Sequence, residues 1–183
     1  VTALVAEADG GERLLKTALA RGADEALLIP LEGDEGAPAP STRARIPLLV
    51  DAIEKLAPDL VLAGILSTDD LYGELAPQLA AKLNWPQASA ISNVQLDDGV
   101  VTVRQEYAGG VAAFLELETP AVIGLQTAGQ PPRYVSGSKL RELLNVQIPQ
   151  MVPILDYEDD LASSSLLKLP DTSSGAIIIQ GNA

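Results

Sequence analysis

Residues Pro58–Pro86 read PDLVLAGILSTDDLYGELAPQLAAKLNWP, and this stretch decides the fold. It begins with a continuous apolar run typical of a buried strand, continues through the short polar loop ILSTDD, and ends in an amphipathic run with helical spacing. Open α/β sheets bind nucleotides where a loop at the carboxyl end of a strand leads into a helix. The stretch therefore predicts an α/β fold with a nucleotide-type loop.

The composition limits the size and class of the protein. The chain has 183 residues, enough for one domain, or one domain with an arm, and for one substantial core. Hydrophobic residues make up 47% of it but aromatic residues only 3%, so we expect a core of Ala, Leu, Val and Ile. No apolar run has the length of a membrane span and no signal-peptide pattern is present, which predicts a cytoplasmic location, or the mitochondrial matrix in a eukaryote.

Charge and missing residue types exclude several functions. The formal net charge of −13 repels phosphate at long range, which argues against nucleic acid and against anionic membranes as partners and favours a basic partner surface. The chain has no Cys and no His, so it has no thiol nucleophile, no disulfide and no imidazole base or metal ligand. We therefore expect any activity to belong to a bound cofactor or to a partner.

The rest of the first half repeats the pattern of strand and helix. VTALVAEA and EALLIP are apolar runs that predict strands, and Gly22 is expected to cap the helix between them with a left-handed conformation. A second helix is predicted to begin at Ser41 or Thr42 and to run to about Leu56. The apolar faces of these helices are expected to comprise Leu14, Leu15, Ala18 and Leu19 in the first, and Ile46, Leu49, Val50 and Ile53 in the second. Continuously apolar strands that alternate with helices favour a parallel sheet covered on both faces.

The pattern changes after Ala88. Turn signals at Asp97–Gly99 and Gly109-Gly110 separate β-rich runs, which predicts an antiparallel excursion that returns to the sheet through PAVIGLQ. A loop then opens at PPRY, Ser138–Leu144 predicts one short helix, and the residues from Val146 onward are apolar without a period and include a final short strand, GAIIIQG. Such a tail is expected to wrap a surface rather than to form a core.

Several of these segments, in this order, resemble the β subunit of electron transfer flavoprotein. They cover the chain from residue 1 to about Leu144, with a fainter likeness in the tail. The segments are ALARGADEALLI, PDLVLAG with STDD, AAKLNWPQAS, the hairpin that ends at Gly109-Gly110, TPAVIGLQ and PPRY. Each is weak alone, but together they are a strong signal. Members of the family normally carry a further strand and helix before the segment that begins here at Val1. Three explanations of this difference are open: an incompletely recorded chain, a trimmed polypeptide and a natural minimal relative.

The resemblance implies a fold, a partner and a cofactor. It implies a Rossmann-like, mainly parallel sheet flanked by helices over residues 1–145, with an antiparallel hairpin excursion, and an extended C-terminal arm over residues 146–183 that packs on the partner. That partner is an electron transfer flavoprotein α-type subunit, which holds most of the FAD, while a flavin dehydrogenase donates electrons. The alternative is a redox-inactive assembly or scaffold subunit that has kept the fold and lost the nucleotide. A universal-stress-type nucleotide regulator would need a phosphate loop rich in Gly and Ser, which is absent.

The resemblance also implies a nucleotide site for AMP or a second FAD. The residues that it assigns to this site are Ala6, Gly64, Ser67, Thr68, Asp69, Asp70, Gly73, Glu74 and Leu75. Two simpler explanations remain open: Gly64 permits a sharp turn, and Ser67 to Asp70 cap the following helix. Where many relatives have Asn, Gln and Thr against the phosphate, this chain has Gly73, Glu74 and Leu75. A carboxylate beside a phosphate is repulsive by on the order of several kcal/mol, which favours a site that has lost its nucleotide.

The segment YVSGSKL aligns with the loop that the family uses to dock its dehydrogenase. The residues assigned to docking are Tyr134, Val135, Gly137 and Leu140, and many relatives have an exposed Leu where this chain has Gly137. Either docking uses Val135 and Leu140 instead, or the partner differs. The alternative to a docking role is that this segment is an ordinary turn. The acidic pairs at Asp97-Asp98 and in Glu158–Asp160 are read as a hairpin turn and a solvated tail, so no metal site is predicted.

Overall fold

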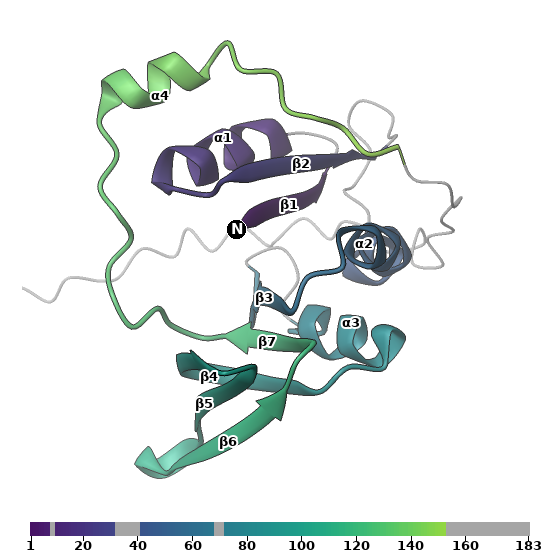
Figure 1. The fold of residues 1–183 in the computed structure, drawn as a ribbon, viewed down its shortest axis with the longest axis vertical. Helices are drawn as coiled ribbons and strands as arrows, with labels where there is room; N and C mark the ends of the chain where they lie inside the picture. Colours follow the sequence, from purple (N-terminus) through teal and green to yellow (C-terminus); the bar gives the residue numbers. More distant parts are fainter. Residues whose placement is uncertain (8–9, 32–40, 68–71, 153–183) are drawn as a thin grey trace, which may run out of the picture.

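The structure is a computed structural model that describes residues 1–7, 10–31, 41–67 and 72–152. It is an α/β protein with two sheets, each with helices against it (Figure 1). The strands are β1 Thr2–Glu7, β2 Glu25–Pro30, β3 Leu60–Gly64, β4 Gln87–Asp97, β5 Val100–Glu106, β6 Ala112–Glu118 and β7 Ala121–Leu125. The helices are α1 Gly11–Arg21, α2 Thr42–Leu56, α3 Leu75–Leu83 and α4 Gly137–Leu143, with a short 3-10 turn at Ala108–Gly110. The predicted α/β class and the order of the elements are confirmed.

The parallel strands fall into two sheets, where the sequence predicted one. β1 pairs only with β2, in parallel, and the second sheet has the order β3-β7-β4-β5-β6. In that sheet β3, β7 and β4 are parallel, while β5 and β6 run antiparallel as the predicted excursion. The chain turns at Asp98-Gly99 and at Gly109-Gly110, where all three glycines and Asp98 have positive φ, as the turn signals predicted.

Helix α2 joins the two sheets. Its residues Leu48 and Ala52 pack on Ala6 and Ile29 of the first sheet, and its residues Ile46 and Ile53 pack with α3 and Val122 of the second sheet. Ser41 is the N-cap of α2, and its hydroxyl accepts a hydrogen bond from the N–H of Ala44 at 3.2 Å, as predicted. The buried face of α2 differs from the prediction in that Leu48 and Ala52 are buried while Leu49 and Val50 are only half-buried.

Helix α1 covers the other face of β1 and β2. Leu15 is fully buried in a cluster with Ala26 and Leu28, while Leu14 is 59% exposed and was wrongly placed on the apolar face. The expected left-handed cap at Gly22 is confirmed, with φ 110 and with hydrogen bonds from the cap N–H groups to the carbonyls of Ala18 and Leu19.

The segment after β7 crosses from the second sheet back to the first. It passes through α4 and then runs beside β2 (Figure 1). The N–H of Leu28 donates to the carbonyl of Pro149 at 3.0 Å, and the N–H of Met151 donates to the carbonyl of Leu28 at 2.8 Å. Ile148 is 8% exposed and lies in the α1–β2 cluster, so the first residues of the expected arm pack on this chain itself. Residues 153–183, which include the predicted final strand and Glu158–Asp160, lie outside the described residues.

Candidate functional site

The candidate site is the loop between β3 and α3, at the carboxyl end of a parallel strand. The N–H of Ile65 donates to the carbonyl of Leu125 at 2.9 Å, which extends the β3–β7 pairing by one residue beyond Gly64. Leu66 follows and is 55% exposed, so the chain leaves the sheet at this point. The predicted position of the loop is therefore confirmed, although Thr68, Asp69 and Asp70 lie outside the described residues.

Helix α3 begins later than the sequence predicted. Its first residue is Leu75 and its N-cap is Glu74, so Ser67 is not its capping residue. Gly73 has φ +66, a left-handed conformation that a right-handed helix cannot include, and this explains why the helix does not begin over the loop. Pro77 lies in the first turn, where its missing N–H costs no helical hydrogen bond.

The glycines at the two ends of the loop, Gly64 of β3 and Gly73 before α3, have different surroundings. A Cβ on Gly73 would lie 2.8 Å from the carbonyl oxygen of Ile65, and the positive φ also favours glycine, so the backbone geometry demands this residue. A Cβ on Gly64 would meet nothing within 4 Å, and the φ of Gly64 lies outside the left-handed region. A sharp turn therefore does not explain Gly64, whose backbone lies beside open space.

Glu74 is held by residues of α2 and α3. Its carboxylate lies 3.6 Å from the Arg43 guanidinium, in the first turn of α2, and accepts a hydrogen bond from the side-chain amide of Gln78. A carboxylate at a helix N-terminus is favoured by the helix dipole, and this one places negative charge where a phosphate would otherwise be favoured.

Two other predicted site residues turn their side chains into the core. Leu75 packs against the cluster that contains Ile53 and Leu79, and Ala6 is 6% exposed in the cluster beneath α2. Neither side chain offers a hydrogen-bond donor to an anion.

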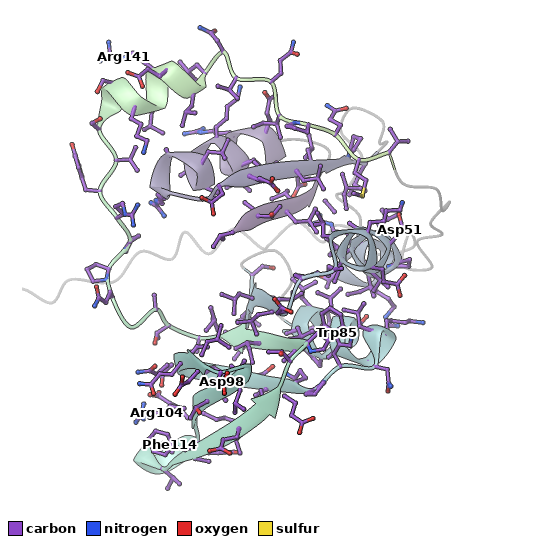
Figure 2. The ribbon with its side chains drawn as sticks, viewed as in Figure 1. Asp51, Trp85, Asp98, Arg104, Phe114 and Arg141 are labelled. Carbon is purple, nitrogen blue, oxygen red and sulfur yellow. The ribbon has the colours of Figure 1, made fainter. Side chains whose placement is uncertain are left out.

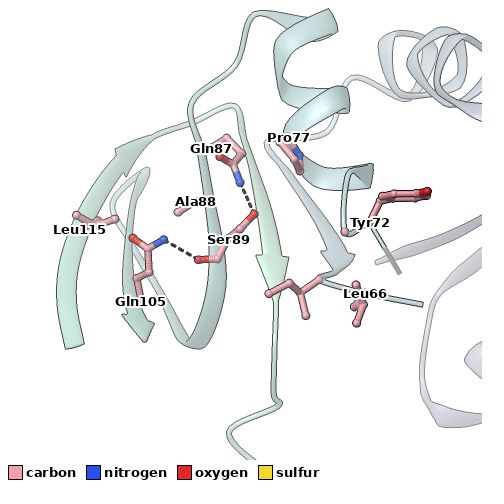
Figure 3. Close-up of a pocket in the computed structure, with 10 residues that line it drawn as sticks. Leu66, Tyr72, Pro77, Gln87, Ala88, Ser89, Gln105 and Leu115 are labelled. Carbon is pink, nitrogen blue, oxygen red and sulfur yellow. Dashed lines mark hydrogen bonds between the residues drawn. The ribbon is translucent and has the colours of Figure 1, made fainter. Parts of the chain in front are cut away.

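A pocket of about 530 Å³ lies beside this loop and is lined by residues of the loop, of α3 and of β4 to β6 (Figure 3). Of the predicted site residues that the structure describes, only Gly73 lines it. The side-chain amide of Gln87 donates to the hydroxyl of Ser89, and the amide of Gln105 donates to the Ser89 carbonyl at 2.8 Å. Other lining residues include Ile65, Leu66, Pro77 and Leu115.

These polar residues were not predicted from the sequence, because the region after Ala88 has only the pattern of an antiparallel hairpin. One signal was available in Gly124 of β7. A Cβ there would lie 2.7 Å from the hydroxyl of Ser89, so this glycine makes room for a polar side chain against the sheet.

Three of the predicted nucleotide residues, Gly73, Glu74 and Leu75, offer a phosphate no side-chain donor. Gly73 and Leu75 have no side-chain donor, and Glu74 brings a carboxylate to the start of the helix. Among the described residues, no group of three or more His, Cys, Asp or Glu could hold a metal ion that would bridge the Glu74 carboxylate and a phosphate. Away from this loop, on β5, hydrogen bonds from Ser92 and Arg104 lower the pKa of Glu106.

The predicted docking residues lie on the segment that crosses between the sheets. Tyr134 is 89% exposed, Val135 is half-buried and Leu140 is 39% exposed. Gly137 is the first residue of α4, and the hydroxyl of Ser136 caps this helix by accepting from the N–H of Lys139. The helix expected at Ser138–Leu144 is thus confirmed with a shift of one residue.

The chain is an α/β protein whose loop lies at the carboxyl end of a parallel strand, the position at which open α/β sheets bind ligands. The family model for the electron transfer flavoprotein domain matches residues 1–150. The chain belongs to the electron transfer flavoprotein family, as the resemblance in the sequence predicted.

The similar proteins are β subunits. The electron transfer flavoprotein subunit beta of Methylophilus methylotrophus is 35% identical over 130 residues, which are 70% of this chain and 48% of that protein. The subunit beta of Dictyostelium discoideum is 31% identical over 169 residues, 90% of this chain and 64% of that protein. The subunit beta of Mus musculus is 30% identical over 169 residues, 90% of this chain and 65% of that protein. The chain thus spans between about half and two thirds of the length of these relatives.

Among the residues that the structure describes, no helix is long and apolar enough to cross a membrane.

Proposed function

We propose that this chain is the β-type subunit of an electron transfer flavoprotein heterodimer. It would pass electrons from a flavin dehydrogenase to a downstream acceptor, through FAD that is held mainly by an α-type subunit. The observation that carries this proposal is the family match over residues 1–150, together with relatives that are named β subunits. A cytoplasmic location, or the mitochondrial matrix in a eukaryote, belongs to the same proposal, since one relative from Oryza sativa is named mitochondrial.

The chain's own residues contribute position and electrostatics. Bound FAD supplies the redox chemistry, because the sequence has no Cys and no His to supply a thiol or an imidazole. The two sheets, joined by α2, form a platform for the α-type subunit. The arm over residues 146–183 would contribute to that contact, although its residues up to Met151 also pack on β2.

The segment that crosses between the two sheets after β7, residues 126–150, is the proposed docking site for the flavin dehydrogenase. Tyr134 and Leu140 supply exposed apolar surface on either side of the α4 N-terminus. Gly137 has no side chain to insert into a partner pocket, so these two residues and Val135 are the available anchors.

We infer that the loop after β3 keeps the frame of a nucleotide site without its phosphate contacts. Gly73 is required by backbone geometry, Glu74 is paired with Arg43, and Leu75 is part of the core. The heterodimer is therefore expected to hold FAD but no AMP and no second FAD. The test is to denature the purified heterodimer and to quantify released nucleotides by mass spectrometry; stoichiometric AMP would refute the inference.

The second candidate is a redox-inactive scaffold subunit. It is favoured by the same three residues, because a subunit without a nucleotide role needs no phosphate contacts. The two candidates differ in one observable property. A scaffold subunit would form a complex with the α-type subunit, but no dehydrogenase would reduce flavin in that complex.

Co-expression with an α-type subunit tests the proposal. The full chain and a tagged α-type subunit are produced together, and the mass of the purified complex is measured by native mass spectrometry. The expected result is a heterodimer of one copy of each chain. If the chain instead remains separate and soluble, the proposed function is wrong.

A further inference from the structure

We propose that the pocket beside the β3–α3 loop binds an uncharged molecule that carries a carboxamide or lactam group on an apolar ring. This pocket, called here the Ser89 pocket, is the cavity of about 530 Å³ that is lined by the loop, α3 and the strands β4 to β6. Its volume falls within the range of about 300 to 1,000 Å³ that is typical of small-molecule sites. The inference goes beyond the proposed function and does not rest on it, because the pocket is formed within this one chain.

The backbone of β4 is distorted where it borders the pocket. Ala90 has φ 59, a left-handed conformation that residues with a side chain rarely adopt. The pairing of β4 with β7 shifts its register between Ala88 and Ile91, around this residue. Bulges redirect side chains and are frequent beside functional sites, and strained backbone conformations cluster at such sites as well. The irregularity of β4 therefore points to a role of Ser89 beyond the pairing of strands.

The distorted strand contributes a cluster of neutral polar groups to the pocket wall (Figure 3). The carbonyl of Ser89 accepts a hydrogen bond from the side-chain amide of Gln105 at 2.8 Å, and the Ser89 hydroxyl accepts one from the side-chain amide of Gln87. Gly124 leaves room for the Ser89 side chain, because a Cβ on Gly124 would lie 2.7 Å from the Ser89 hydroxyl oxygen. Residues of β4, β5 and β7 thus build this cluster together.

The cluster offers hydrogen-bond donors and acceptors side by side. A glutamine side chain has two N–H groups and one carbonyl oxygen, and each hydrogen bond to Ser89 uses only one N–H group. The Ser89 hydroxyl accepts from Gln87, which leaves its own hydrogen as a donor. A carboxamide or lactam also has a donor and an acceptor next to each other, so its polar edge is complementary to this cluster.

The remaining lining favours an uncharged ligand with an apolar ring. None of the described residues that line the pocket is charged, and apolar side chains such as Leu66 and Pro77 form much of the wall. Arg104, which Figure 2 shows on the hairpin, precedes Gln105 and therefore lies on the opposite face of β5, where it pairs with Glu106. Transfer of an ionised group into a partly apolar site without an opposite charge is costly, and the net charge of −13 disfavours an anion further.

Titration of the isotope-labelled full chain with three ring compounds of similar size tests the proposal. Benzamide carries a neutral carboxamide, benzoate a carboxylate and toluene only a methyl group. The NMR chemical shifts of the side-chain amides of Gln87 and Gln105 report on binding in the pocket. Benzamide is expected to bind at least about tenfold more tightly than either of the other two compounds. The proposal is overturned if benzoate or toluene binds as tightly, if AMP displaces benzamide, or if benzamide causes no saturable shift.

Two variants of the same strand separate the polar cluster from a general effect on the fold. Gln87→Leu replaces a lining carboxamide with an apolar side chain of similar size, and Gln95→Leu does the same at an exposed position of β4 that does not line the pocket. Gln87→Leu is expected to weaken benzamide binding about fivefold, and Gln95→Leu less than about twofold. Toluene should bind to Gln87→Leu at least as tightly as to the unsubstituted chain, which shows that this variant keeps the pocket. Equal effects of the two substitutions on benzamide binding would contradict the proposed site.

Discussion

The geometry of the loop after β3 predicts that Gly73 tolerates no side chain. In Gly73→Ala, the left-handed backbone costs about 1 to 2 kcal/mol. The new Cβ would also lie 2.8 Å from the Ile65 carbonyl oxygen, and relieving that overlap by a backbone shift costs about 1 kcal/mol or more. We therefore expect the free energy of unfolding to fall by about 3 kcal/mol.

Two other glycines serve as matched controls. Gly99 has φ +81 with nothing within 4 Å of a Cβ, so Gly99→Ala isolates the cost of the backbone conformation, about 1 to 2 kcal/mol. Gly64 has neither a left-handed φ nor a neighbour within 4 Å, so Gly64→Ala is expected to change the free energy of unfolding by about 0.5 kcal/mol or less.

Urea unfolding followed by tryptophan fluorescence measures all three variants. Trp85 is the single tryptophan and packs against the cluster that contains α3, directly after the helix that Gly73 precedes. Linear extrapolation gives each free energy. The reasoning is refuted if Gly73→Ala is no more destabilising than Gly99→Ala, because the contact with Ile65 would then carry no cost.

Three further predictions concern the framework around the site. Leu15→Ala should lower the free energy of unfolding by about 3 kcal/mol, since the Leu15 side chain is fully buried against β2. Leu14→Ala should change it by less than about 1 kcal/mol, because Leu14 is 59% exposed. Equal losses for the two variants in urea unfolding would contradict this packing. Ser41→Ala should cost about 1 kcal/mol because it removes the N-cap of α2, an effect visible as a lower thermal midpoint that Ser41→Asp restores. The pKa of Glu106 is lowered by hydrogen bonds from Ser92 and Arg104, so its pairing stabilises the fold above the ordinary pKa of Glu and is lost as the pH falls through the lowered value. Glu106→Gln should therefore flatten the acid limb of stability against pH, measured by urea unfolding, more than Glu118→Gln does.

The sequence predicted the elements well because their signals are local. The caps at Ser41 and Gly22, the turn at Asp98-Gly99 and the short helix at α4 all depend on residues within a few positions of each other. Pairing between strands depends on distant residues, and the division of the parallel strands into two sheets could not be read from apolar runs alone.

The candidate site was predicted in place but not in detail. The loop after β3 follows from the order of apolar and polar residues, whereas the late start of α3 follows from the left-handed Gly73 and its contact with the Ile65 carbonyl. The partners of Glu74 come from α2 and α3, and the pocket beside Ser89 depends on Gly124 of another strand. These contacts join residues that are far apart in the chain, so the spacing of residues within one segment does not predict them.

The bound-ligand content of the co-purified complex tests the central claim most directly. The full chain is purified with its α-type subunit, and absorbance spectroscopy with mass spectrometry counts flavin and adenine nucleotide per heterodimer. The expected result is one FAD and no AMP per heterodimer. A heterodimer without flavin would contradict an electron transfer role, and one that holds AMP or a second FAD would contradict the reading of Gly73, Glu74 and Leu75.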